Sequence, residues 1–238
     1  MKTETGKNRP SHLRWLAYGA LAWFSLLMLR ITLNYWPMRD DAGFLQIKQQ
    51  YLGILVWKAA FWVHVFSSMF TLVAGFTQFS PAILRGRRSL HRWMGRLYVV
   101  AILVVSGPSS LVMAFYANGG IGSRIAFVTL AVLWLATTAM AWRKVVQRQW
   151  QAHRDWMIRS YALTLSAITL RCWKYLLIFF FEPRPMDVYR LVAWLGFVPN
   201  LLVAERIIRR MRRKRSESGV EGREPPVNLR SSKRPCPR

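Results

Sequence analysis

Hydrophobic residues along the chain form six long runs that are separated by short polar stretches. The first run covers residues 15–36, four more lie within residues 54–181, and the last covers residues 188–204. A helix of about 20 apolar residues spans a hydrocarbon layer about 30 Å thick. The pattern therefore predicts an all-α membrane protein with six transmembrane helices, of which spans two to five form a four-helix core.

Polar and helix-breaking residues set the expected limits of the core helices. The four runs within the core cover about 54–79, 89–117, 124–142 and 153–181. Pro108 predicts a kink in the second of these helices, because proline removes a backbone donor and disturbs the preceding turn.

Charge then gives the chain an orientation. Lys and Arg number 35 against 10 Asp and Glu, and they gather in residues 1–14, 85–96, 143–154 and 205–238. Cytoplasmic loops of membrane proteins carry an excess of Lys and Arg, so both termini and both basic loops are expected on the cytoplasmic side of a bacterial inner membrane. The run at 15–36 is then a retained signal anchor, because no small-residue cleavage site follows it.

Composition also predicts the surroundings of the protein. A net charge of +25 together with 53% hydrophobic residues is typical of a membrane protein with cationic edges, so we expect no nucleic-acid partner. The basic loops and tail should contact anionic lipid headgroups. Residues 205–238 are expected to be a basic, disordered tail, because the sequence beyond Ser216 is rich in Pro and Arg and lacks apolar periodicity.

One face of the fifth predicted helix is polar although the helix is otherwise apolar. At about 100° per residue, His153, Ser160, Thr164 and Arg171 fall within roughly 20° of one line. None of the ten acidic residues lies in the interior of a predicted span, since Asp155 falls in the first turn of the run 153–181, so Arg171 has no carboxylate partner at its depth. We expect Arg171 to line the bundle interior beside Ser160 and Thr164; the alternative is that its side chain snorkels to the outer surface.

The second predicted helix has a polar face of its own, which includes His64 and Gln78. Helical rise places His64 level with Arg171. Together with Ser160 and Thr164, these residues are candidates for a polar cavity that would bind an anion. The alternative for His64 is an interhelical hydrogen bond.

Two further histidines, His91 and His153, lie in the first turns of the third and fifth predicted helices, at the same cytoplasmic depth. A haem b iron takes two axial imidazoles, so this pair is the candidate ligand set if the two helices are neighbours. Arg159 or Arg171 would then balance the charge of a haem propionate or a quinone. The alternative is that both histidines are interfacial residues that bind lipid phosphate or water.

Motifs of the common enzyme classes are absent from the sequence. It contains no glycine-rich phosphate loop, no nucleophile elbow, no zinc-ligand spacing and no pair of carboxylates within a predicted span. No catalytic residue is therefore assigned, and enzymatic activity stays open.

Three short segments carry a resemblance to a known family. They are HRWMGRLY at residues 91–98, HRDWMIRS at 153–160 and TLR at 169–171. These segments resemble the signature of a bacterial membrane family named domain of unknown function 2306, and His64 with GFTQF at residues 75–79 fits its preceding helix. The resemblance covers residues 54–181, and the family name implies no activity.

A weaker, architectural similarity is to cytochrome b561-type proteins, which hold two haems in a four-helix core. His91 and His153 match one haem-ligating pair by helix, whereas the fourth predicted helix has no histidine opposite His64. Two hypotheses follow. The first is a haem b electron-transfer protein with a quinone or another redox partner, and the second is a non-redox protein that binds or transports an anionic lipid or metabolite.

Overall fold

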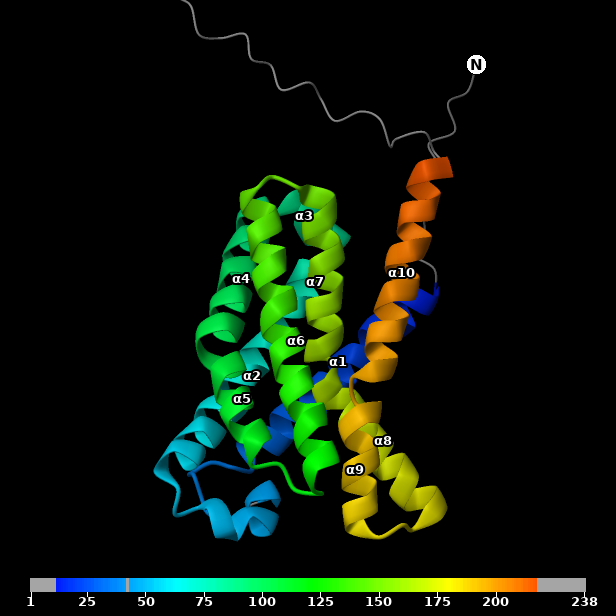
Figure 1. The fold of residues 1–238 in the computed structure, drawn as a ribbon. Coiled ribbons are helices and arrows are strands. Elements are labelled where there is room, and N and C mark those ends of the chain that lie inside the picture. The colour runs from blue at the N-terminus through cyan, green and yellow to red at the C-terminus, as the bar shows by residue number, and fades with distance from the viewer. Residues whose placement is uncertain (1–11, 42, 218–238) are drawn as a thin grey trace, which may run out of the picture.

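Helices joined by short turns make up the described part of the chain, residues 12–41 and 43–217 of a computed structural model (Figure 1). In chain order they are α1 (His12–Leu33), the 3₁₀ helix η1 (Gly43–Tyr51), α2 (Leu55–Gln78), α3 (Pro81–Gly86), α4 (Arg88–Val100), the π-helix η2 (Ala101–Ser106), α5 (Gly107–Phe115), α6 (Ile121–Val146), α7 (Trp150–Thr164), α8 (Ser166–Phe181), α9 (Pro185–Leu195) and α10 (Val198–Glu217). The predicted leader at 1–14 and tail at 205–238 fall partly outside the described residues.

Among the residues that the structure describes, five helical stretches are long and apolar enough to cross a membrane, which confirms the predicted class of an all-α membrane protein. They are Leu55–Gly75, Arg88–Phe115, Ile121–Val146, Trp150–Phe181 and Pro185–Glu217, and Gly19–Leu33 of α1 is a shorter apolar helix. Each long stretch after the first combines a basic or amphipathic end with an apolar middle, as the sequence pattern indicated.

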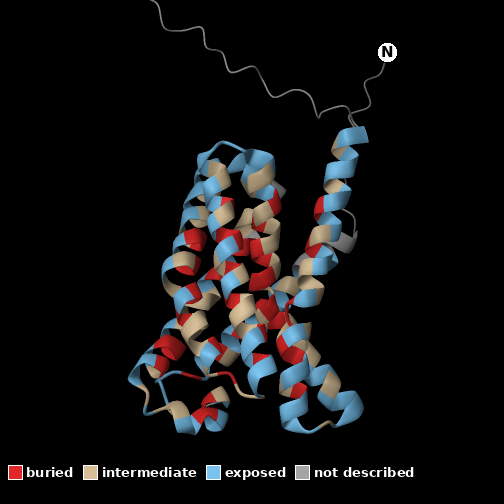
Figure 2. Ribbon diagram, viewed as in Figure 1, coloured by how far each residue is buried: buried red, intermediate tan, exposed pale blue. Residues whose placement is uncertain are grey.

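The bundle that carries the buried core consists of α2, the α4–η2–α5 rod, α6 and α7. Helix α6 packs along α7 and against α5, while α2 packs against α4, η2 and α5. Buried residues concentrate inside this bundle, whereas α10 is exposed along most of its length (Figure 2). The close approach of α2 to α7 depends on Gly75, because a Cβ atom there would overlap the ring of Tyr161.

The basic segments lie together in space. Helix α3, the turn between α6 and α7, and the last turns of α10 all lie at one end of the molecule, which we call the basic end (Figure 1). The segment η1 and the turn between α8 and α9 lie at the other end, the opposite end (Figure 1).

Pro108 changes the helix type within the second long stretch, Arg88–Phe115. The helix widens into the π-helical segment η2 immediately before Gly107 and Pro108, which begin α5. A π-helical turn absorbs the carbonyl groups that a proline leaves without a donor. The predicted kink is therefore accommodated as a local change of helix type.

The fourth long stretch is broken at Leu165, which separates α7 from α8. An uninterrupted helix would use the Ala162 carbonyl for the N–H of Ser166. That carbonyl instead accepts a hydrogen bond from Asn200 Nδ2 at 3.0 Å. The break was not predicted, because no proline or glycine marks it and its partner lies on another helix.

The last long stretch is broken as well, between α9 and α10, where Pro199 removes a donor and crowds the Leu195 carbonyl. The two breaks face each other, since Thr169 donates to the Gly196 carbonyl at 2.5 Å and Asn200 Nδ2 donates to Thr169 Oγ1 at 3.0 Å. Helices α8 and α9 pack together beyond the breaks.

Helix α10 corrects the expected start of the tail. The sequence placed the end of the last span at residue 204 and a disordered tail from 205 onward, but the helix continues to Glu217. Residues 205–217 are ordered because α10 packs against α7 and forms ion pairs with it. Residues 218–238 lie outside the described part.

Aromatic residues close the opposite end of the bundle. Trp57, Phe61 and Tyr35 pack around the buried Leu45 of η1. Lys48 of η1 is also buried, with its Nζ donating to the Tyr116 carbonyl and to Asn118 Oδ1. These contacts join η1 to the turn between α5 and α6.

Candidate cofactor site

His91 and His153 lie in the first turns of α4 and α7, near the basic end of the bundle. Their imidazoles are close enough to interact electrostatically. The two helices meet inside the bundle, because Tyr98 of α4 is hydrogen-bonded to Ser160 and Thr164 of α7. The helices that carry the two histidines are therefore neighbours, which is the condition that the haem hypothesis set.

Each of these imidazoles is anchored through one ring nitrogen. His153 Nδ1 lies 2.9 Å from the Ala141 carbonyl oxygen, and since a carbonyl only accepts, Nδ1 carries the proton. The His91 ring is hydrogen-bonded to the backbone of Thr77, while its Nδ1 is buried without a partner among the described residues. Each imidazole thus keeps one nitrogen free, which is the arrangement found in metal-bound histidines.

Gln78 belongs to the surroundings of His91. Its Nε2 donates to the His91 carbonyl at 3.1 Å and to Thr77 Oγ1 at 3.3 Å. Gly95 lets the two helices approach here, because a Cβ atom at that position would lie 3.0 Å from Gln78 Oε1. The end of α2 therefore fixes both the backbone and the ring of His91.

A closed network of hydroxyl groups lies about two helical turns deeper. Tyr98 Oη is 2.8 Å from Ser160 Oγ and 2.9 Å from Thr164 Oγ1, and Thr138 Oγ1 is 2.7 Å from Ser160 Oγ. Trp134 Nε1 donates to Thr164 Oγ1 at 3.0 Å. Sequence analysis found Ser160 and Thr164 but missed Tyr98, whose only signal is its position seven residues after His91 on the same helical face.

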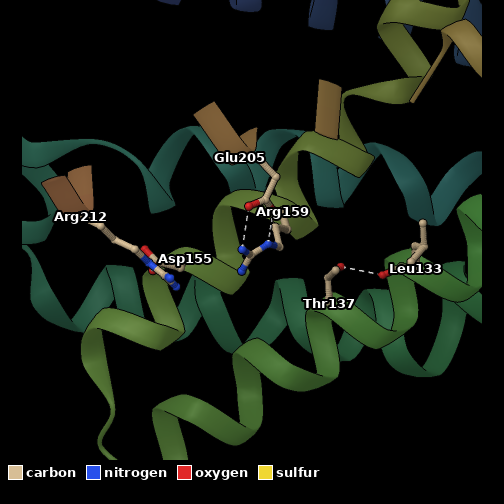
Figure 3. A network of polar contacts seen from close by, with 6 residues as sticks. All are labelled: Leu133, Thr137, Asp155, Arg159, Glu205 and Arg212. Carbon is tan, nitrogen blue, oxygen red and sulfur yellow. Dashed lines mark hydrogen bonds and ion pairs between the residues drawn. The ribbon is translucent and has the colours of Figure 1, made fainter. Parts of the chain in front are cut away.

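Arg159 is not free to balance a cofactor's charge. Its guanidinium forms two hydrogen bonds with the Glu205 carboxylate, at 2.5 and 3.0 Å (Figure 3). The guanidinium also lies over the ring of Trp156. A second pair joins the same helices, with Arg212 Nε 2.9 Å from Asp155 Oδ2 (Figure 3). Arg159 therefore holds α10 against α7.

These ion pairs use two acids at the ends of the predicted spans. Asp155 lies in the second turn of the helical stretch Trp150–Phe181, and Glu205 lies in Pro185–Glu217, one residue beyond the predicted end of the last span at 204. The Asp155 side chain is only 4% exposed.

The structure divides the predicted polar face of the fifth span. Ser160 and Thr164 point into the bundle toward Tyr98, whereas Arg171 lies beyond the break at Leu165 and interacts electrostatically with His64. His64 Nδ1 is 3.1 Å from the Ser106 carbonyl, the interhelical hydrogen bond that was its alternative. The five residues assigned to one cavity thus belong to three places: Gln78 at His91, Ser160 and Thr164 at Tyr98, and His64 at Arg171.

Comparison of the sequence with known protein families gives one match. The model of the family described as "Predicted membrane protein (DUF2306)" matches residues 61–208, which run from α2 into α10. The chain belongs to this family. The DUF2306 region includes His64, His91, His153 and Arg171, and it extends past the predicted limit at 181 to include Glu205. No curated protein and no solved structure matches the chain.

Proposed function

We propose that this DUF2306 protein binds one haem b between His91 and His153 and transfers electrons within the membrane. The observation that supports the proposal is the pair of imidazoles near the basic end, each anchored to a backbone group through one nitrogen and free at the other. Haem b, when bound by two imidazoles, supplies a one-electron redox centre.

The residues around the pair would orient the ligands and exclude water. The Ala141 carbonyl holds the Nδ1 proton of His153, so Nε2 would be the atom available to hold the haem iron. Gln78 fixes the backbone of His91. The hydroxyl network around Tyr98 closes the bundle interior below the histidines, because its groups bond to one another and leave few sites for water.

We also infer the location and partners of the protein from its charges. The gathering of basic segments at one end supports a bacterial inner-membrane protein with both termini and the basic end in the cytoplasm. Anionic lipid headgroups would contact the basic loops and the charged part of α10. The electron partner would be a quinone or another redox protein.

An absorption spectrum of the purified full-length protein, reduced minus oxidised, tests the proposal. We expect a haem b difference spectrum in the wild type and its loss in both His91→Ala and His153→Ala, because each substitution removes an axial ligand. His64→Ala is the matched control and should keep the spectrum, since His64 bonds to Ser106 and interacts with Arg171. Wild-type protein that contains no haem after expression with ample haem supply would refute the proposal.

A further inference from the structure

Arg171 is a cation in the apolar part of α8 whose charge is not balanced by the described protein. It lies ten residues before the end of the helix at Phe181, about 15 Å along the axis. Its Nη1 donates to the Ala167 carbonyl at 2.7 Å, and among residues 12–41 and 43–217 no ion pair includes it. A guanidinium carries five N–H donors, so most of its hydrogen-bonding capacity is unused by the protein.

The direction of the side chain shows that Arg171 does not reach for the outer surface. Ala167 lies one turn earlier in α8, so the hydrogen bond turns the guanidinium back toward the middle of the helical stretch. Snorkelling, which was the alternative expectation from the sequence, would point the guanidinium toward the end of α8 at Phe181 instead. Lys174 of the same helix is exposed and can take that course.

Two polar side chains from other parts of the chain lie near the guanidinium. Tyr35, which follows α1, and His64 of α2 both interact electrostatically with Arg171. Tyr35 Oη accepts a hydrogen bond from the Phe44 N–H at 2.9 Å, so its own O–H is left to donate. His64 is held in place by the Ser106 carbonyl. The guanidinium of Arg171 therefore interacts with a phenol whose O–H can still donate and with a fixed imidazole.

Apolar side chains of three helices surround this point. Met28 of α1, Leu72 of α2 and Ile168 of α8 form a buried cluster, against which Cys172, the neighbour of Arg171, also packs. A ligand at Arg171 would thus have an anionic head beside the donors and an apolar body along α1, α2 and α8.

We propose that Arg171 binds the carboxylate of a long-chain fatty acid or a similar amphiphile, with Tyr35 and His64 contributing to the polar surroundings of the guanidinium. A carboxylate matches the guanidinium fork with two parallel hydrogen bonds, and its single negative charge neutralises a single partly buried cation. An unpaired charge at this depth is costly, so occupation by such an anion stabilises the fold. The site is separate from His91 and His153 and does not depend on haem.

Thermal unfolding of the full-length protein in detergent, followed by its tryptophan fluorescence, tests this site with palmitate as the probe. At a palmitate concentration about 100-fold above the dissociation constant, we expect the Tm of the wild type to rise by roughly 5 °C or more. Arg171→Gln should abolish the rise. Lys174→Gln removes the same charge from an exposed position of α8 and should preserve it.

Three further arms identify the ligand chemistry. Methyl palmitate has the tail without the charge, acetate has the charge without the tail, and neither should raise the Tm. Arg171→Lys should reduce the palmitate effect without abolishing it, because lysine gives a point charge without the planar fork. This variant and the methyl palmitate arm keep the test valid if Arg171→Gln does not fold.

Several outcomes would overturn the proposal. One is the absence of any palmitate effect on the wild type, and another is an equal effect on Arg171→Gln. Equal protection by methyl palmitate would show that the tail alone binds, and equal protection by acetate would show that the site takes small anions. The palmitate effect on the Tm does not depend on whether the protein binds haem. The haem proposal and the carboxylate proposal can therefore fail independently.

Discussion

Single polar residues inside this protein are held by backbone groups more often than by other charges. His64 and His153 bond to the carbonyls of Ser106 and Ala141, and His91 bonds to the backbone of Thr77. Such bonds fix a ring's orientation and tautomer without adding a charge to an apolar interior. Each histidine is therefore presented with a defined free nitrogen, which a ligand site requires.

The lowered pKa of the buried Lys48 makes the stability of the protein depend on pH. Burial, together with the nearby Arg124, lowers the pKa of Lys48 from 10.5 to about 8. Between those values the unfolded chain keeps a proton that the folded protein has lost, so the stability contributed by this group rises with pH. We expect the wild type to gain on the order of 2 kcal/mol relative to Lys48→Met between pH 8 and pH 10.

Thermal unfolding of both proteins across this pH range measures the difference. The free energy of unfolding of the wild type, relative to that of Lys48→Met, should increase as the pH rises. If this difference in the free energy of unfolding stays constant or decreases, the folded protein holds the Lys48 proton up to the ordinary pKa of lysine.

At the scale of helices, the last two long stretches are each divided by a break, and the halves have different roles. Helices α8 and α9 pack on each other, while α10 is attached to α7 by the pairs Arg159–Glu205 and Asp155–Arg212. The carbonyls released at the breaks are satisfied by Thr169 and Asn200. Buried backbone groups need such partners, which explains how both breaks persist in an apolar region.

Removal of Arg212 tests the attachment of α10. Arg212→Ala leaves the buried Asp155 carboxylate without a cation, and Asp155 Oδ1 already has no partner among the described residues. We expect a loss of about 1–3 kcal/mol, seen as a lower Tm in detergent. Arg213→Ala is the control, because its pair with Glu217 is exposed and should contribute less than about 1 kcal/mol.

The carboxylate itself can be removed to check the cause. If the loss comes from an unpaired buried charge, Asp155→Asn combined with Arg212→Ala should recover part of the stability. Equal effects of Arg212→Ala and Arg213→Ala would argue against an ion-pair attachment of α10.

For the whole molecule, the most consequential feature is the separation of charge between its two ends. Arg-rich segments far apart in the sequence meet at the basic end, and the opposite end is closed by η1 and its aromatic contacts (Figure 1). A cell membrane distinguishes the two ends, because Lys and Arg are retained on the cytoplasmic side. The site at His91 and His153 would then face the cytoplasm.

Cysteine labelling in intact cells tests this orientation. In a background with Cys172 and Cys236 replaced by serine, a cysteine at Arg87 should resist a membrane-impermeant maleimide, and a cysteine at Gln50 should react. Both should react once the membrane is permeabilised, which confirms that each position is accessible. Labelling of the Arg87 position in intact cells would reverse the topology and place the histidine pair on the outer side.

The sequence by itself determined the helical membrane class, the approximate apolar stretches and the placing of His91 and His153 in the first turns of their helices, because hydrophobic run length and helical periodicity are local properties. The family resemblance likewise rested on short local segments, and the family match confirmed it. The break at Pro199 also has a local cause, although it was not predicted.

Only the tertiary structure decided which polar residues meet. The break at Leu165 has its partner on α10, so the continuous face from His153 to Arg171 existed only for an unbroken helix. The same applies to Arg159, whose partner Glu205 is 46 residues away, and to Tyr98, whose partners lie 62 and 66 residues away. Periodicity shows which residues share a helix face, but the side chain opposite that face depends on how helices pack, and this packing requires contacts distant in sequence.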